Sequence, residues 1–126
     1  MAFPNDWTRK ARLTIDHTKV DADLTDFPVL LTAGNLPSEM LDAGGAHTAQ
    51  SDGGDLRFTS DPEGENPIPA EVVDFQPANM PGNTSAEVWV KPDALSSGSD
   101  TEIYAWWDAD GGASQPAPTD PLGTEA

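Results

Sequence analysis

Strict alternation of apolar and polar residues, in short runs separated by turn residues, is the feature that most limits how this chain folds. Residues 85–91 and 101–108 both alternate in this way, and a period of two places successive side chains on opposite faces of a β-strand. One face of each run is apolar and is expected in the core: Ala86, Val88 and Val90 in the first, Ile103, Ala105 and Trp107 in the second. The pattern predicts two β-strands joined by a polar turn around residues 96–98.

The opposite face of these two strands mixes aromatic and charged side chains. If the strands pair antiparallel across the turn, Trp89, Tyr104 and Trp106 come within cross-strand reach of one another. Three roles stay open for these candidate binding or interface residues. They form core that the protein's own loops cover, such as residues 76–84, or the centre of an interface with a partner or second copy, or a platform on which sugar rings stack.

The remainder of the chain repeats the pattern of short strands and turns. Strands are expected at residues 7–16, 27–32, 55–59 and 68–75, the last with a bulge or change of side at Val73. The run at 27–32 is almost continuously apolar, as in a strand buried on both faces, whereas Pro28 places it near an edge or marks its first residue. Residues 35–41 predict a single helical turn.

These elements predict an all-β fold: an antiparallel β-sandwich, jelly-roll-like, with one short helical turn and an extended C-terminal arm. The chain has 126 residues, the size of one domain, and its 12 prolines and 11 glycines favour many turns over long helices. The sandwich is expected to occupy residues 1–108. Residues 109–126 lose all periodicity and have the proline- and glycine-rich composition of a linker or extended arm.

The charge of the chain limits its partners. Its 22 acidic and 6 basic residues give a formal net charge of −16, which disfavours nucleic acid and anionic membranes. The acidity serves either solubility, also in salty surroundings, or the binding of divalent cations. The N-terminus has neither the basic start nor the apolar run of a secretory signal, and no apolar stretch is long enough to span a membrane. We therefore expect synthesis in a cytoplasm.

One segment near the N-terminus is locally basic. Arg9, Lys10 and Arg12 lie on the first expected strand, and Lys19 follows shortly after it. Two roles are open for this segment. It pairs with acidic neighbours of its own sheet, or it docks onto an acidic partner or a second copy of the chain.

No residue pattern indicates catalysis or a cofactor. Glu71, Glu87 and Glu102 are mid-strand carboxylates, which are usually only solvated, so the chain is not expected to be an enzyme. Residues 51–55 and 108–112 have the oxygen ligands of a calcium loop, but neither matches the EF-hand spacing, and both are sufficient as plain turns. His17 and His47 are expected as surface histidines. The chain has no cysteine, and no metal ligand set or cofactor is predicted.

The order of several motifs resembles the DUF2341 family. The resemblance covers residues 7–114 and rests on six segments: Trp-Thr-Arg-Lys-Ala-Arg-Leu-Thr-Ile-Asp at 7–16, Leu-Thr-Asp-Phe-Pro-Val-Leu at 24–30, Gly-Asp-Leu-Arg-Phe-Thr at 54–59, Pro-Ala-Glu-Val at 69–72, Ala-Glu-Val-Trp-Val-Lys at 86–91 and Ser-Gly-Ser-Asp-Thr-Glu-Ile-Tyr at 97–104. Members of that family are β-rich modules that often precede a concanavalin A-like (LamG-type) domain in surface and phage-related proteins. The resemblance therefore implies a β-sandwich without catalytic residues. The chain departs from the family at residues 106–109, where Trp-Trp-Asp-Ala replaces Tyr-Tyr-Gly-Asn.

The resemblance to the DUF2341 family and the lack of a secretory signal together favour a component of a phage particle, whose parts are made in the host cytoplasm. The expected function is that of a non-catalytic structural or decoration protein of a virion, in capsid or tail, which attaches to other virion proteins and forms a homo-oligomer. Such a module could also present a further domain. The alternative is a carbohydrate-binding module that recognises host or environmental glycans.

Overall fold

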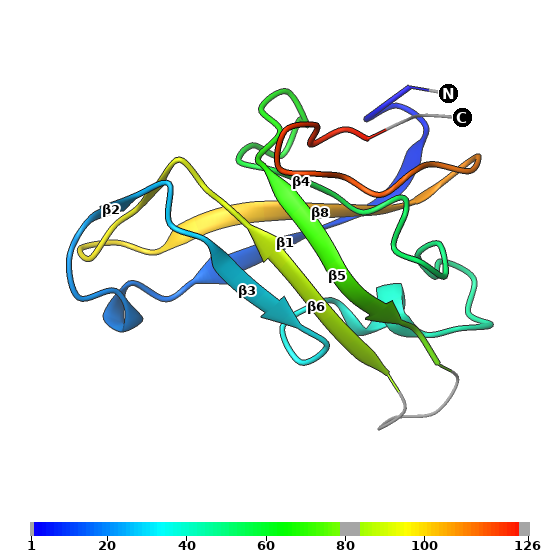
Figure 1. Cartoon of the computed structure of the whole chain (residues 1–126), viewed down its shortest axis with the longest axis horizontal. Helices are drawn as coiled ribbons and strands as arrows, with labels where there is room; N and C mark the ends of the chain where they lie inside the picture. Colours follow the sequence, from blue (N-terminus) through cyan, green and yellow to red (C-terminus); the bar gives the residue numbers. More distant parts are fainter. Residues whose placement is uncertain (1, 79–83, 124–126) are drawn as a thin grey trace.

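Antiparallel strands dominate the computed structural model, which describes residues 2–78 and 84–123 (Figure 1). Two 3-10 turns interrupt them, η1 at His17–Lys19 and η2 at Ser38–Leu41. The strands are β1 Trp7–Ile15, β2 Leu24–Thr25, β3 Val29–Thr32, β4 Arg57–Thr59, β5 Ala70–Gln76, β6 Ser85–Val90, β7 Ala94–Leu95 and β8 Thr101–Ala109. The predicted all-β antiparallel fold is confirmed, and η2 lies within the predicted helical turn.

The strands of the described residues form two three-stranded sheets and one short ribbon. The orders are β1-β8-β4 in one sheet and β3-β6-β5 in the other, and β2 pairs with β7. The alternating runs that contain β6 and β8 therefore lie at the centres of different sheets, and the predicted pairing between them is wrong. The connection from β6 to β8 does not reverse as a hairpin, because its middle forms β7 on β2 and Asp23 accepts hydrogen bonds from Ser97. It carries the chain from one sheet to the other.

The core lies between the inner faces of the two sheets. The predicted inward sets from β6 and β8 face this core. Val88, Ile103 and Ala105 are at most 1% exposed, and Ala86 is partly buried against it. Phe58 of β4 and Leu31 of β3 belong to the same cluster. Alternation therefore identified the core faces correctly, although the pairing of the strands was not the predicted one.

Two strands differ in informative ways from simple alternation. β3 is an edge strand, as Pro28 indicated, but it is not buried on both faces, since Leu30 is 40% exposed on its outer side. In β5 the register to β6 shifts between Val72 and Asp74, which confirms the predicted bulge. The extra residue, Val73, is 56% exposed.

The C-terminal segment lies along the protein's own surface. Gln50 and Ala113 exchange two hydrogen bonds of 2.9 and 3.0 Å, and Gln115 donates to the carbonyl of Asp52. Arg57, fully buried on β4, donates to the carbonyl of Ser114 at 3.0 Å. In Figure 1 this segment, in orange and red, runs beside the loop before β4. Residues 110–123 thus cover one end of the sandwich.

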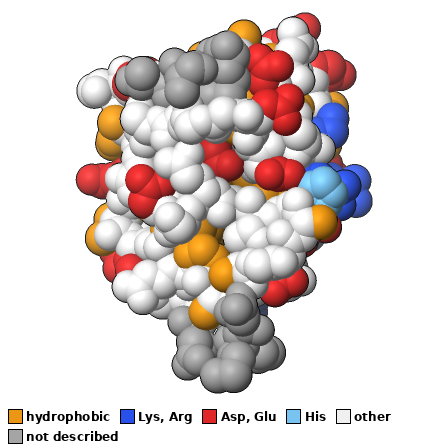
Figure 2. All heavy atoms as spheres, turned by 90° about the vertical axis from the view of Figure 1, so that its right-hand side faces the viewer, with side chains coloured by type: hydrophobic (Ala, Val, Ile, Leu, Met, Phe, Trp, Pro, Cys, Tyr) orange, Lys and Arg blue, Asp and Glu red, His pale blue; other side chains and the backbone are white. Residues whose placement is uncertain are grey.

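No helix in the described ranges is long and apolar enough to cross a membrane. Figure 2 shows that acidic side chains (red) are distributed over the face of the molecule that it presents, as expected of a chain with 22 acidic residues.

Candidate binding site

Trp106 is not an exposed platform. It lies on the outer face of β8, but its side chain is only 7% exposed because several groups cover it. The Phe3 ring packs edge-on at 5.2 Å, and the Lys10 ammonium lies 5.1 Å from the indole centroid. The indole N–H donates to Thr59 Oγ1 at 2.9 Å. Of the three roles open for this residue, the geometry corresponds to core covered by the protein itself.

The other candidates on this sheet have partners within the molecule. Register places Arg12 opposite Tyr104 on the outer face, and the Arg12 guanidinium lies 3.7 Å from Glu102 in an exposed pair. Lys10 donates to the carbonyl of Pro62 at 2.6 Å. The basic segment is thus in contact with acceptors of its own domain.

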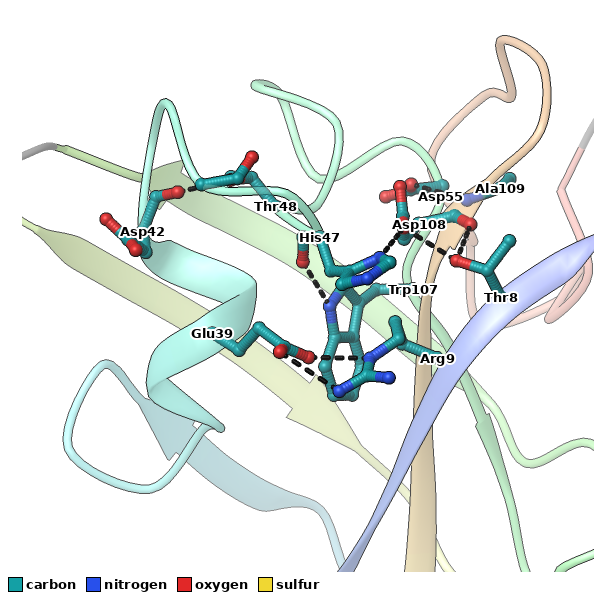
Figure 3. A network of polar contacts seen from close by, with 11 residues as sticks. Thr8, Arg9, Glu39, Asp42, His47, Thr48, Asp55, Trp107, Asp108 and Ala109 are labelled. Carbon is teal, nitrogen blue, oxygen red and sulfur yellow. Dashed lines mark hydrogen bonds and ion pairs between the residues drawn. The ribbon is translucent and has the colours of Figure 1, made fainter.

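Arg9 points to a different face from Lys10 and Arg12. It is opposite Trp107 in the β1–β8 register and makes a two-pronged ion pair with Glu39 of η2, at 2.7 and 3.0 Å. The Glu39 carboxylate raises the pKa of Arg9 above its ordinary value, because it accepts hydrogen bonds from the guanidinium and carries the opposite charge. Figure 3 shows this pair beside Trp107. It fastens η2 to the first strand, so Arg9 is a structural contact.

Trp89 lies on the other sheet, away from Tyr104 and Trp106. It is the central residue of the outer face of β6, opposite Leu30 on β3 and Glu71 on β5. Its indole N–H donates to Glu87, two residues earlier on the same face, at 3.0 Å. This bond fixes the ring orientation while the side chain remains half-buried. The structure therefore divides the predicted aromatic cluster between two sheets.

A groove of about 370 Å³ lies beside Trp89. Its walls are three prolines from separate parts of the chain, Pro28, Pro69 and Pro118. Its charged residues are Glu71 of β5 and Lys91, which directly follows β6. Pro28 and Pro69 directly precede β3 and β5, where the missing N–H of proline does not interrupt a strand ladder. The groove is open to solvent, mostly apolar, and of a size that small-molecule sites have.

Sequence reasoning found Trp89 but not this groove. Two of the prolines lie near the start of segments predicted to be strands, and that arrangement is a usable signal for rigid walls at the end of a sheet. The third wall, Pro118, comes from the segment predicted to be a linker or arm, and nothing local in the sequence shows where that segment packs.

A second polar cluster surrounds the end of β8 (Figure 3). His47 Nδ1 lies 2.7 Å from Asp108 Oδ2, and Thr8 Oγ1 donates to the same oxygen at 2.6 Å. The Trp107 indole donates to the carbonyl of His47 at 2.7 Å. Asp108 adopts a left-handed backbone with φ of 61°, which these contacts support. Within the described ranges, the imidazole is hydrogen-bonded to a carboxylate and to no hydroxyl.

The acidic loop at residues 51–55 uses its carboxylates internally. Asp55 is 3% exposed and accepts N–H bonds from Gln50 at 2.9 Å and Ala109 at 3.2 Å. Burial raises the pKa of Asp55, although these donors oppose the shift. Asp52 accepts the N–H of Gly54 and the Gln50 amide. These bonds close the loop onto β8 without requiring a cation.

No family model, curated protein or solved structure matches this chain.

Proposed function

We propose that this chain is a non-catalytic binding module whose recognition site is the Trp89 groove, and that the site accepts a sugar ring of a neutral glycan. The observation that carries the proposal is a half-buried indole, fixed by Glu87, in an open groove of about 370 Å³. Grooves of this volume hold small ligands.

The chemistry of the lining favours a carbohydrate. The flat indole offers an apolar surface for the C–H face of a pyranose, and the prolines give rigid apolar walls. Glu71 and Lys91 place an acceptor and a donor at the groove, where sugar hydroxyls need both. A formal net charge of −16 repels uronic acids, sialic acids and sulfated sugars. The favoured ligand is therefore a neutral sugar.

The lining does not favour hydrolysis. Glycosidases generally place two carboxyl groups on either side of the scissile bond. Among the described lining residues, Glu71 is the one carboxylate, and Glu87 is engaged with the indole it orients. The groove has the composition of a site that binds without reaction.

The same face supports a second candidate function, attachment to other proteins as a structural or decoration module of a phage particle. Three large apolar side chains are exposed on or beside this sheet: Phe27 by 49%, Leu30 by 40% and Val73 by 56%. Exposed apolar groups around an aromatic residue are typical of protein interfaces. The resemblance described above supports this setting, in which the module binds other virion proteins or its own copies.

Tryptophan fluorescence tests the carbohydrate proposal directly. Trp7, Trp106 and Trp107 are at most 7% exposed, so Trp89 is the indole that a ligand in solution reaches. Glycans selected on an array of neutral and acidic sugars should change the emission of the protein and protect it from acrylamide quenching. Trp89→Ala should abolish binding, whereas Val73→Ala, on the same sheet but outside the groove lining, should retain it.

Light scattering distinguishes the two functions. An array without any bound glycan would overturn the carbohydrate proposal. A wild-type oligomer that Trp89→Ala or Leu30→Ala converts to monomer would then favour the structural role. A wild-type monomer that binds neutral glycans through Trp89 would exclude self-assembly through this face.

A further inference from the structure

The ends of β1 and β8 bring together three side chains of the kinds that ligate metals in proteins. β1 ends at Ile15 and β8 begins at Thr101, and these residues are partners in the antiparallel register. Asp16 and His17, directly after β1, therefore lie beside Asp100, directly before β8. The juxtaposition joins positions 83 residues apart in the sequence and is a consequence of the β1–β8 pairing.

The three side chains converge closely enough to share one ion. His17 Nδ1 lies 2.6 Å from Asp100 Oδ1, and one ligand atom from each of Asp16, His17 and Asp100 lies within 4.8 Å of the others. Asp16 and Asp100 are exposed and His17 is half-buried, so an ion can approach from solvent.

We propose that Asp16, His17 and Asp100 form a surface site for a divalent transition-metal ion such as Zn²⁺ or Mn²⁺. An imidazole nitrogen with two carboxylate oxygens suits these ions, with water in the open positions. The imidazole sets the group apart from a purely acidic cluster and disfavours Ca²⁺, which prefers oxygen ligands only. The site does not depend on the glycan proposal, because it lies on other residues.

Hydrogen bonds orient the two carboxylates. The Thr18 hydroxyl and N–H donate to Asp16, and the backbone N–H of His17 donates to Asp100 at 3.0 Å. The acidic surface of the chain also attracts cations.

A bound ion would connect the end of β1 to the start of β8. It would bind the folded chain far better than the unfolded chain, where the ligands are apart, and so raise stability by mass action. We expect the melting temperature of the protein to rise with Zn²⁺ concentration, and EDTA to reverse the rise.

The chain contains its own control, because it has two histidines and each faces an aspartate. Within the described ranges, His47 and Asp108 are not part of a three-ligand group. Substoichiometric Mn²⁺ should broaden the NMR signals of the His17 ring and leave those of the His47 ring sharp. Equal broadening of both rings, or of neither at a tenfold molar excess of Mn²⁺, would overturn the proposal.

Calorimetric titration with Zn²⁺ then tests the ligands. His17→Gln and Asp16→Asn should each weaken binding at least about tenfold, the loss that removing even an outer-shell partner causes at metal sites. His47→Gln should leave the affinity unchanged. If both ligand variants keep the wild-type affinity for Zn²⁺, the heat of binding comes from another site, and the proposed site is rejected. The paramagnetic experiment uses the wild-type chain, so the test stands even if a variant does not fold.

Discussion

At the scale of single residues, Asp61 shows how a turn in this protein depends on an ionised carboxylate. Its two oxygens accept the N–H groups of Glu65 at 2.9 Å and Asn66 at 2.8 Å. Desolvation is the largest single effect and raises the pKa of Asp61, but the hydrogen-bond donors together outweigh it, and the pKa lies below its ordinary value. A carboxylate with a lowered folded pKa contributes stability above the unfolded pKa of about 3.9 and loses it as the pH falls through the folded pKa.

We expect Asp61→Asn to lower the free energy of unfolding by about 1 kcal/mol near pH 7, the net value of a solvent-screened hydrogen bond to a charged acceptor. The difference from wild type should shrink as the pH falls below about 4, where the wild-type carboxylate also becomes neutral. Urea denaturation from pH 2.5 to 7 measures the loss of unfolding free energy at pH 7 and its decrease at lower pH. Glu63→Gln removes a charge from the same turn and controls for net charge. A difference that does not change with pH would show that the charge of Asp61 is not responsible.

The four tryptophans show how far residue-level prediction reaches. Trp89 and Trp106 have the same local pattern, an indole on the polar face of a central strand. Their exposure differs because Phe3 and Lys10 cover Trp106, whereas proline walls leave Trp89 accessible. Arg57 is similar, since alternation predicts an outward side chain but the C-terminal segment buries it. What covers an outer face comes from distant segments, and a local pattern does not contain that information.

At the scale of elements, the C-terminal segment, residues 110–123, packs closely over the buried Arg57 of β4. Gly123 adopts φ of +57°, and a Cβ placed there would lie 2.6 Å from the Ser114 carbonyl oxygen and 2.8 Å from Arg57 Nη2. Such an approach has no room for a side chain. The segment 110–123 therefore closes over the buried arginine only with glycine at this position.

We expect Gly123→Ala to destabilise the fold by about 1–3 kcal/mol through overpacking and backbone strain. Gly98→Ala is the matched control, because the nearest atom to its Cβ is the Ser96 hydroxyl at 3.8 Å, and its effect should stay within about 0.5 kcal/mol. Thermal unfolding of the two variants gives the comparison. Equal melting temperatures would mean that residues 110–123 do not pack on β4 in solution and behave as a linker.

Strands were predictable from sequence, but their partners were not. Periodicity of two is local, so the core faces of β6 and β8 followed from their residues, as did the bulge in β5. Pairing is non-local: β8 joins β1 across most of the chain. The groove and the proposed metal site both depend on such pairing, since Trp89 needs Leu30 and Glu71 beside it, and His17 needs Asp100. Neither site was predictable without the sheet order.

At the scale of the whole molecule, negative charge is the dominant property. The ion pairs of the described residues are few and exposed, such as Arg9–Glu39 and Arg12–Glu102, and exposed pairs contribute little. They do not compensate a formal net charge of −16. Repulsion among the remaining carboxylates should therefore weaken the folded state more than it weakens the expanded unfolded chain.

Salt should consequently stabilise this protein. The screening length falls from about 30 Å at 0.01 M to about 10 Å at 0.1 M salt, so repulsion across the molecule is largely removed. We expect the melting temperature to rise by roughly 3–6 °C for each kcal/mol of repulsion relieved in a domain of this size. Calorimetry from 10 mM to 0.5 M NaCl, with EDTA present to exclude trace metals, measures the rise.

A variant with three exposed acids neutralised separates charge from other effects of salt. Asp21→Asn, Glu63→Gln and Asp93→Asn together reduce the negative charge while leaving the described ion pairs intact. This variant should melt higher than wild type at low salt and respond less to added NaCl. If the melting temperature of wild type instead falls as NaCl is added, attraction within the ion pairs outweighs repulsion among the carboxylates. The acidic surface then does not destabilise the folded state. The acidity would then be compatible with stability at low salt, and its role would lie in selecting cations and neutral ligands.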